Sequence, residues 1–206
     1  MDILGREIEA KFLLPHLADL RARLLAGGGR LVSPRTLELN LRFDDESRRL
    51  SAAGRVLRLR RDRSTHLTYK APGPTPEERV EVEVEVEHPD DGRRFLEALG
   101  YHVVAAYEKY REIFDLGGAS VMLDELPFGH FVEIEADSLE AVRTSAGMLG
   151  LAWEQRLRAS YLDLFEAVRT RLGRTVDQAT FAAFENVPAL SFAELETLAR
   201  RQEMPA

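Results

Sequence analysis

Glutamate and lysine alternate with apolar residues near the start of the chain, in the stretch from Arg6 to Phe12. Successive side chains of an extended strand point to opposite faces, so Glu7, Glu9 and Lys11 would share one face. Carboxylates can bind a hard divalent cation, and an ammonium group beside them can bind phosphate. The stretch therefore predicts either a metal and phosphate site or the solvated face of a surface strand.

Charged residues occupy the same alternating positions in later segments. From Arg79 to Glu87, valine alternates with charged residues at every position. Carboxylates that follow one another on one strand face repel each other, so we expect positively charged side chains to lie opposite them. The residues that share this pattern are the acids Glu7, Glu9, Glu81, Glu83, Asp124, Glu133 and Glu135 and the bases Lys11, Arg58, Arg60, Lys70, Arg79, Lys109 and Arg111.

Two arrangements fit this alternation. In a sandwich, the apolar faces would close on each other and the charged faces would be solvated. In a closed antiparallel barrel, the apolar faces would point outward beneath helices and the charged faces would line the lumen. The charged faces hold almost only Glu, Arg and Lys, which favours the barrel. Buried like charges are costly, and a polyphosphate with divalent metal ions would compensate both sets.

The same patterns predict the secondary structure. We expect strands over 6–12, 36–44, 55–63, 67–70, 79–87, 101–114, 120–126 and 131–136, where apolar and polar residues alternate. Helical spacing of apolar residues predicts helices over 15–25, 90–99 and 138–149 and from residue 159 onward. The proline-rich stretch 72–76 predicts a loop outside any sheet. The expected fold class is α+β, with peripheral helices and a helical C-terminal tail.

The composition limits the ligands and the cellular compartment that we expect for the protein. The chain has 206 residues, a formal net charge of -7, a pI of about 5.4 and no cysteine. An acidic protein is not expected to bind nucleic acid or an anionic membrane over its general surface. The absence of cysteine excludes disulfides and thiolate metal sites. The N-terminus lacks the pattern of a signal peptide. No apolar run approaches the roughly 20 residues that a membrane-spanning helix needs. We therefore expect a cytoplasmic protein.

The motifs and their order resemble the CYTH superfamily, the triphosphate tunnel metalloenzymes. Glu7-x-Glu9-x-Lys11 is similar to the ExExK signature of that family. Residues 57–60, 67–70, 79–83, 108–111, 123–125 and 131–135 match its later strands in order. The resemblance covers about residues 3 to 165 and is greatest to bacterial class IV adenylate cyclase-like and thiamine triphosphatase-like proteins. Asn40 departs from the pattern of many members, so the inner-face role of its strand stays open.

The resemblance implies a closed eight-stranded antiparallel β-barrel that binds a small-molecule triphosphate and Mg²⁺ or Mn²⁺. Residues 1–172 would form this domain and residues 173–206 a helical extension. The implied metal ligands are Glu7, Glu9, Asp124, Glu133 and Glu135. The implied phosphate ligands are Lys11, Arg58, Arg60, Lys70, Arg79, Lys109 and Arg111. The implied catalytic residues are Lys11, as a base if its pKa is depressed, and Glu81 and Glu83, as metal ligands or groups that position a nucleophile.

Three functions stay open. We place metal-dependent hydrolysis of inorganic triphosphate, thiamine triphosphate or a nucleoside triphosphate first, because it needs only water and a bound metal. A class IV adenylate cyclase, which converts ATP to cyclic AMP and pyrophosphate, also needs a correctly posed nucleoside. A non-catalytic polyphosphate-binding module is the third. Each charged residue could instead form a salt bridge across the lumen.

The tail from Thr175 is expected to lie outside the tunnel. Its apolar positions indicate a packing face, which would cover the barrel wall or join a second subunit in a homodimer. These positions are Phe181, Phe184, Leu190, Phe192 and Leu195.

Overall fold

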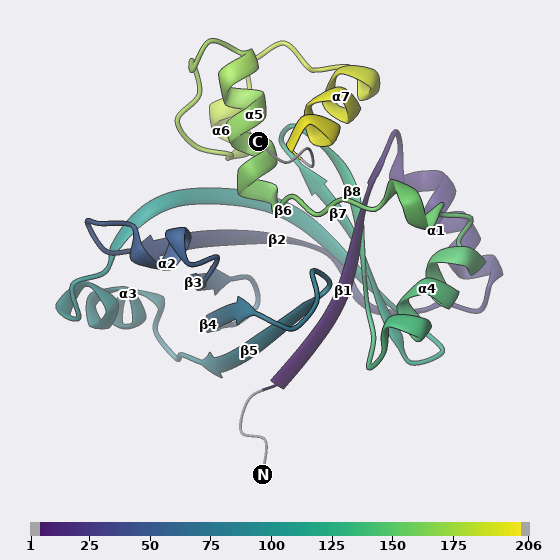
Figure 1. Ribbon diagram of the computed structural model, residues 1–206, viewed down its shortest axis with the longest axis horizontal. Coiled ribbons are helices and arrows are strands. Elements are labelled where there is room, and N and C mark those ends of the chain that lie inside the picture. Colours follow the sequence, from purple (N-terminus) through teal and green to yellow (C-terminus); the bar gives the residue numbers. More distant parts are fainter. Residues whose placement is uncertain (1–4, 203–206) are drawn as a thin grey trace.

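The computed structural model describes residues 5–202, and its eight strands close into a barrel (Figure 1). The strands are β1 (Gly5–Leu14), β2 (Arg30–Asp44), β3 (Val56–Arg61), β4 (Thr65–Pro72), β5 (Glu78–Glu85), β6 (His102–Leu116), β7 (Ala119–Leu126) and β8 (Gly129–Glu135). Their order around the barrel is β1-β5-β4-β3-β2-β6-β7-β8, and neighbouring strands are antiparallel. The predicted closed antiparallel barrel is thereby confirmed.

Helices pack on the outside of the barrel in three groups. They are α1 (Leu17–Ala26), α2 (Arg49–Ala52), α3 (Pro89–Ala98), α4 (Leu139–Met148), α5 (Tyr161–Arg171), α6 (Phe181–Phe184) and α7 (Phe192–Gln202), with a 3₁₀ turn at Trp153–Gln155. Figure 1 shows α1 and α4 on one flank, α2 and α3 on the other, and α5, α6 and α7 above the barrel. Each group packs on one apolar cluster. Within residues 5–202, no helix combines the length and apolar character that a bilayer span requires.

The outward face of β1 explains why its charged face points inward. Ile8, Ala10 and Phe12 are all buried, in the apolar cluster that α1 and α4 complete. Because side chains alternate along a strand, this burial turns the charged residues of β1 toward the barrel interior. The outward residues of β7 and β8 enter the same cluster and have the same effect on their own strands.

Strand β5 is an exception to this helical cover. Its outward-facing Val82 and Val84 are 37% and 50% exposed. The helix that follows it, α3, packs through Leu96 against Leu59 of β3 instead. The prediction that helices cover the apolar strand faces is therefore right for β1, β7 and β8 and wrong for β5.

The sheet register decides which charged residues face each other. Residues directly opposite on antiparallel strands have neighbouring side chains, so their charges interact strongly. The opposing charged pairs on the inner face include Glu9 and Glu135, Lys11 and Glu133, Arg42 and Arg58, Lys70 and Glu81, and Arg111 and Asp124. Glu9 with Glu135, and Arg42 with Arg58, join like charges, so neither pair can neutralise itself.

Two local features differ from the sequence prediction. Asp44 is buried at the end of β2 and accepts hydrogen bonds from the N–H groups of Leu50 and Ser51, at 3.0 and 2.8 Å. These bonds hold α2, a helix that its own sequence did not predict. Pro72 was expected outside any sheet but is the last residue of β4, opposite Arg79. A strand end tolerates proline because the ladder needs no further N–H donor there.

The chain beyond α5 extends the open edge of β6. Strand β7 pairs with β6 only from Tyr110 onward, which leaves the earlier part of that edge without a strand partner. The N–H of Glu108 donates to the carbonyl of Ala179 at 2.9 Å, and Leu195 of α7 is buried in the cluster around α5. The tail therefore packs on the barrel wall and on α5, and the domain boundary at residue 172 stays a prediction.

Candidate functional site

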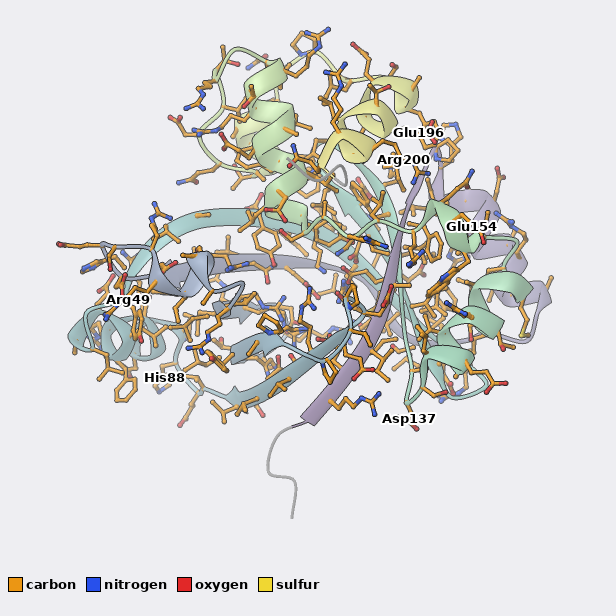
Figure 2. All side chains as sticks on the ribbon, viewed as in Figure 1. Arg49, His88, Asp137, Glu154, Glu196 and Arg200 are labelled. Carbon is orange, nitrogen blue, oxygen red and sulfur yellow. The ribbon has the colours of Figure 1, made fainter. Side chains whose placement is uncertain are left out.

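A chamber of about 610 Å³ lies within the barrel. Most of its wall is formed by inward-facing strand residues, and the start of α5 also contributes to it. Figure 2 shows strand side chains filling the space that the barrel encloses, whereas the labelled Arg49 and His88 lie at the periphery. The predicted site residues on the chamber wall are Glu7, Glu9, Lys11, Arg58, Lys70, Glu81, Glu83, Lys109, Arg111, Glu133 and Glu135.

Three predicted site residues do not line this chamber. Arg60 pairs with Glu83 at 3.3 Å, and Arg79 donates to the backbone carbonyls of Pro76 and Glu78. Both have the same parity as the chamber residues but lie near strand ends, so their position does not support contact with the same phosphate. Asp124 is fully buried behind the wall.

One side of the chamber, which we call the acid wall, is formed by Glu7, Glu9 and Glu135. Glu9 and Glu135 lie opposite each other, and neither makes a hydrogen bond or ion pair within the described chain. Burial, and then the charge of Glu133, raises the pKa of Glu9 above its ordinary value. Burial, and then the charge of Glu7, raises the pKa of Glu135 to about 7. Glu9 and Glu135 have no cation paired with them within the described chain, so a bound cation would stabilise their charged forms.

The acid wall fits the divalent ion that the resemblance implies. Carboxylate oxygens are hard ligands that suit Mg²⁺ and Mn²⁺, and the unpaired carboxylates of Glu9 and Glu135 line the same chamber. No group of three or more acidic or histidine side chains in residues 5–202 forms a complete metal site. Mg²⁺ commonly takes only one or two carboxylates and completes its shell with water and phosphate oxygens. The two unpaired carboxylates meet that requirement.

The metal-free protein is expected to lose stability at Glu135 as the pH rises. The pKa of Glu135 is about 7 in the folded protein against an ordinary 4.5, so folding favours the protonated form. That stabilisation is complete below pH 4.5 and is lost as the pH rises through about 7. Urea unfolding of metal-free protein between about pH 5 and pH 8 should show this loss, and Glu135→Gln should remove it. An equal pH slope in the variant would contradict the assignment.

The carboxylate of Asp124 binds two cationic side chains, Lys109 and Arg111. Its carboxylate accepts hydrogen bonds from Arg111 Nε at 2.7 Å and Lys109 Nζ at 3.0 Å. Glu38, a buried acid that sequence reasoning did not select, lies 3.6 Å from Lys109 and 3.9 Å from Arg111. Both oxygens of Asp124 are already occupied by cations. Asp124 was predicted to be a metal ligand, but its position favours a different role, in which it orients Lys109 and Arg111.

Lys11 is held in its charged form. Burial alone would lower the pKa of Lys11, but the carboxylates of Glu133, at 3.0 Å, and of Glu9 raise it above its ordinary value. The condition for Lys11 to act as a base, a depressed pKa, is thus not met. Glu133 also contacts Arg111, so this predicted metal ligand is engaged by two cations.

The two glutamates predicted to be catalytic differ in their availability. Glu83 accepts a hydrogen bond from Thr68 Oγ1 at 2.7 Å and one from Arg60 at 3.3 Å. Among residues 5–202, Glu81 forms an ion pair only with Lys70, at 3.5 Å, and Lys70 is bound more closely by Glu7. Glu81 therefore has lone pairs left for a ligand in the chamber.

Tyr161 is a site residue that sequence reasoning missed. It is the first residue of α5, which a Ser160–Asp163 capping box starts beside the barrel. Its hydroxyl donates to Asp124 Oδ2 at 2.8 Å, and its ring lies 4.4 Å from Lys11 Nζ. The strand alternation could not identify it because it comes from a helix.

Tyr161→Phe is expected to destabilise the protein by about 1.5 to 3 kcal/mol, the contribution of a hydrogen bond to a charged group. The ring beside Lys11 is kept, so the change isolates the bond to Asp124. Urea unfolding measures the effect. Tyr69→Phe is the matched control, because the Tyr69 hydroxyl makes no hydrogen bond within the described chain. Equal stability of the two variants would show that the Tyr161 bond contributes nothing.

Strand β2 also contributes side chains to the barrel interior, which the sequence left open. Arg42 lines the chamber, and Glu38 and Asn40 are buried on the same inner face. The signal for these residues was the alternation over 36–44, which placed them on one charged face.

Solved structures of other proteins have a similar fold. A conserved hypothetical protein from Pyrococcus furiosus is 26% identical, with a TM-score of 0.67 over 76% of this chain and 98% of that one. A candidate adenylate cyclase from Vibrio parahaemolyticus is 23% identical, with a TM-score of 0.70 over 78% and 97% of the two chains. A Hippeastrum protein, described as a candidate adenylyl cyclase with a dominant triphosphatase activity, is 19% identical, with a TM-score of 0.56 over 79% and 95%.

These structures share the fold with this chain, and no curated protein matches it. The sequence profile of the CYTH domain matches residues 5–160, a range that contains all eight strands of the barrel and the chamber residues that they carry. This match spans well over half of the chain and agrees with the charged barrel interior. The protein therefore belongs to the CYTH domain family.

Proposed function

We propose that the protein hydrolyses a small-molecule triphosphate with Mg²⁺ or Mn²⁺ held at the acid wall. Membership of the CYTH family implies the use of a divalent metal ion. The observation that carries the proposal is the division of one chamber: unpaired Glu9 and Glu135 form one side, and the lysines and arginines of the other strands face the same space. A metal bound to a polyphosphate complements both sides.

The phosphate-binding set that we propose is narrower than the predicted one. Lys11, Arg58, Lys70, Lys109 and Arg111 line the chamber and are retained, whereas Arg60 and Arg79 are not. Asp124 and Tyr161 act on substrate only through Lys109, Arg111 and Lys11, which they orient. Cations fixed in this way can stabilise negative charge that develops on the transferring phosphoryl group.

Glu9 and Glu135, with Glu7, would hold the metal, and Glu81 would position the attacking water through its available lone pairs. When bound, the ion neutralises phosphate oxygens and acidifies water. Lys11 does not remove the proton, because its raised pKa keeps it charged. Its role is to bind a phosphate oxygen beside Glu133.

Parallel incubation with tripolyphosphate, thiamine triphosphate and ATP, each with Mg²⁺ or Mn²⁺, tests the function. Orthophosphate as the product is expected. Cyclic AMP with pyrophosphate would replace hydrolysis by cyclisation, and tight binding without any product would reduce the protein to a polyphosphate-binding module. Product identification by ³¹P NMR separates the three outcomes.

A further inference from the structure

Tyr107 of β6 is a buried chamber residue that the proposed mechanism does not use. It lies on the inner face, two residues before Lys109, and lines the same chamber. The backbone on either side of it is fixed from outside the barrel. Ala179 accepts a hydrogen bond from the N–H of Glu108 at 2.9 Å and donates one to the carbonyl of Ala106 at 3.2 Å. These bonds hold the Tyr107 side chain on the inner face.

The groups around the Tyr107 hydroxyl are mainly cations. The guanidinium group of Arg58, on β3, donates a hydrogen bond to this hydroxyl. Arg42 of β2 and Lys109 of β6 act on it through their charges. The buried acid on this part of β2, Glu38, stands opposite Lys109 and not opposite Tyr107. Within residues 5–202, no carboxylate accepts a hydrogen bond from the Tyr107 hydroxyl.

The two tyrosines of the chamber wall have opposite environments. Tyr161 donates its proton to Asp124 Oδ2 at 2.8 Å, and burial together with the charge of Asp124 raises the pKa of Tyr161 well above its ordinary value. Burial would also raise the pKa of Tyr107, but the positive charges of Arg58 and Lys109 outweigh burial and lower it. Environments that separate the pKa values of two similar groups indicate different acid–base roles. Tyr161 keeps its proton in a structural bond, whereas Tyr107 can release its own.

The other groups of the chamber wall that could donate a proton are already engaged. Each lysine of the wall binds a carboxylate. Arginine does not release its proton in proteins. The hydroxyl of Ser160, at the start of α5, donates to Asp163 at 2.7 Å, and the tail meets β6 through the backbone of Ala179. The carboxylates assigned to the metal are needed in their ionised form. This leaves Tyr107 as the proton donor of the described wall.

We propose that Tyr107 is a catalytic residue whose hydroxyl donates a proton to the oxygen that leaves phosphorus when a bound triphosphate is cleaved. The identity of the substrate rests on the proposed function. The oxygen of water bonds to the terminal phosphorus, the bond from that phosphorus to the bridging oxygen breaks, and the electron pair stays on the bridging oxygen. That oxygen takes the proton of Tyr107. The attacking water loses one proton to solvent, and solvent returns one proton to Tyr107.

The cations around Tyr107 suit this role. After the transfer, Arg58 stabilises the phenolate through the hydrogen bond that it already donates. Before the transfer, a bound polyphosphate offsets part of the positive charge around the hydroxyl, so Tyr107 keeps its proton until the bridging bond breaks. The stabilisation is therefore greatest where charge develops in the reaction.

Tyr107→Phe tests the proposal because it keeps the ring and removes the proton. The variant should lower kcat for tripolyphosphate by roughly 100-fold or more, as expected for the loss of a positioned acid. The affinity of the metal-free protein for tripolyphosphate, measured by calorimetry, should change by less than about 2-fold, because the lost interaction forms only during the reaction. Tyr110→Phe is the matched control on the same strand. The Tyr110 ring packs against Phe181 outside the chamber, so this variant should match the original protein in both assays.

The pH dependence supplies a measurement that a structural role would not change. In the original protein kcat/KM should fall as the pH rises through the lowered pKa of Tyr107, because only the protonated hydroxyl can donate. Tyr107→Phe should lack this fall. Difluorotyrosine in place of Tyr107 keeps the hydroxyl and acidifies it, so the fall should move to lower pH. This second substitution decides the role of the proton where Tyr107→Phe does not fold.

A fall that does not move with difluorotyrosine would overturn the acid role, and so would a Tyr107→Phe loss confined to tripolyphosphate affinity. An unchanged rate in folded Tyr107→Phe would overturn it and leave hydrolysis standing. Cyclic AMP with pyrophosphate from ATP would instead reject hydrolysis. Tyr107→Phe should then slow cyclisation, because the leaving pyrophosphate takes the same proton. The absence of any product from the original protein would overturn both proposals.

Discussion

Glu9→Gln is expected to lower kcat/KM for tripolyphosphate by at least about 100-fold. This is more than the loss usually caused by changing a residue that only hydrogen-bonds to a metal ligand. The amide keeps the size of the side chain but removes the charge that would hold the ion. Steady-state kinetics with saturating Mg²⁺ measures the effect. The barrel should remain folded, because Glu9 forms no ion pair in the described chain.

Stability measurements separate this metal role from general damage. Without metal, Glu9→Gln should melt at the same or a higher temperature, since it removes repulsion from Glu135 and Glu133. With Mg²⁺, the original protein should gain melting temperature and the variant should gain much less. Glu87→Gln, whose side chain is 89% exposed in the original protein, should behave like the original protein in both assays. A folded Glu9→Gln protein with an unchanged rate would refute the metal role.

The strands could be predicted because each carries its own pattern. In β1 and β5, charged and apolar residues alternate, and period two assigns them to opposite faces whatever the rest of the chain does. The choice between sandwich and barrel depended on residue types and on the family resemblance, because alternation fits both. Helical cover could not be predicted strand by strand, as the exposed Val82 and Val84 show.

Parity identifies a face but not a position along it. Arg58 and Arg60 have the same parity on β3, yet Arg58 lines the chamber, whereas Arg60, which pairs with Glu83, does not line it. The pairing of Arg42 with Arg58 could not be predicted either, because it depends on the register between β2 and β3, which the whole sheet determines. Tyr161 reaches Asp124 from a helix 37 residues away in sequence, a contact with no periodic signal.

Arg111→Met is expected to destabilise the protein by about 3 to 5 kcal/mol, the usual result of removing one partner from a buried ion pair. Arg111 is only 8% exposed, and it donates to Asp124 through Nε at 2.7 Å and contacts Glu133. Methionine removes one of the two cations that contact each of these carboxylates, which leaves Lys109 beside Asp124 and Lys11 beside Glu133. For a domain of this size the melting temperature should fall by roughly 6 to 20 °C, which calorimetry can measure.

A second substitution distinguishes charge balance from phosphate binding. Asp124→Asn added to Arg111→Met removes one of the two negative charges that Arg111 balanced and should recover part of the lost stability, but tripolyphosphate affinity should stay low because the guanidinium group is still missing. Recovery of both stability and affinity would mean that Arg111 acts only as a counter-ion.

Arg21→Met is the matched control. Arg21 also binds a carboxylate, that of Glu112, through Nε at 2.9 Å, but its side chain is 45% exposed. Solvent screens that pair, so its loss should leave the melting temperature nearly unchanged. An equally small effect of Arg111→Met would mean that the barrel interior is well hydrated, and that the buried charges need no ligand to balance them.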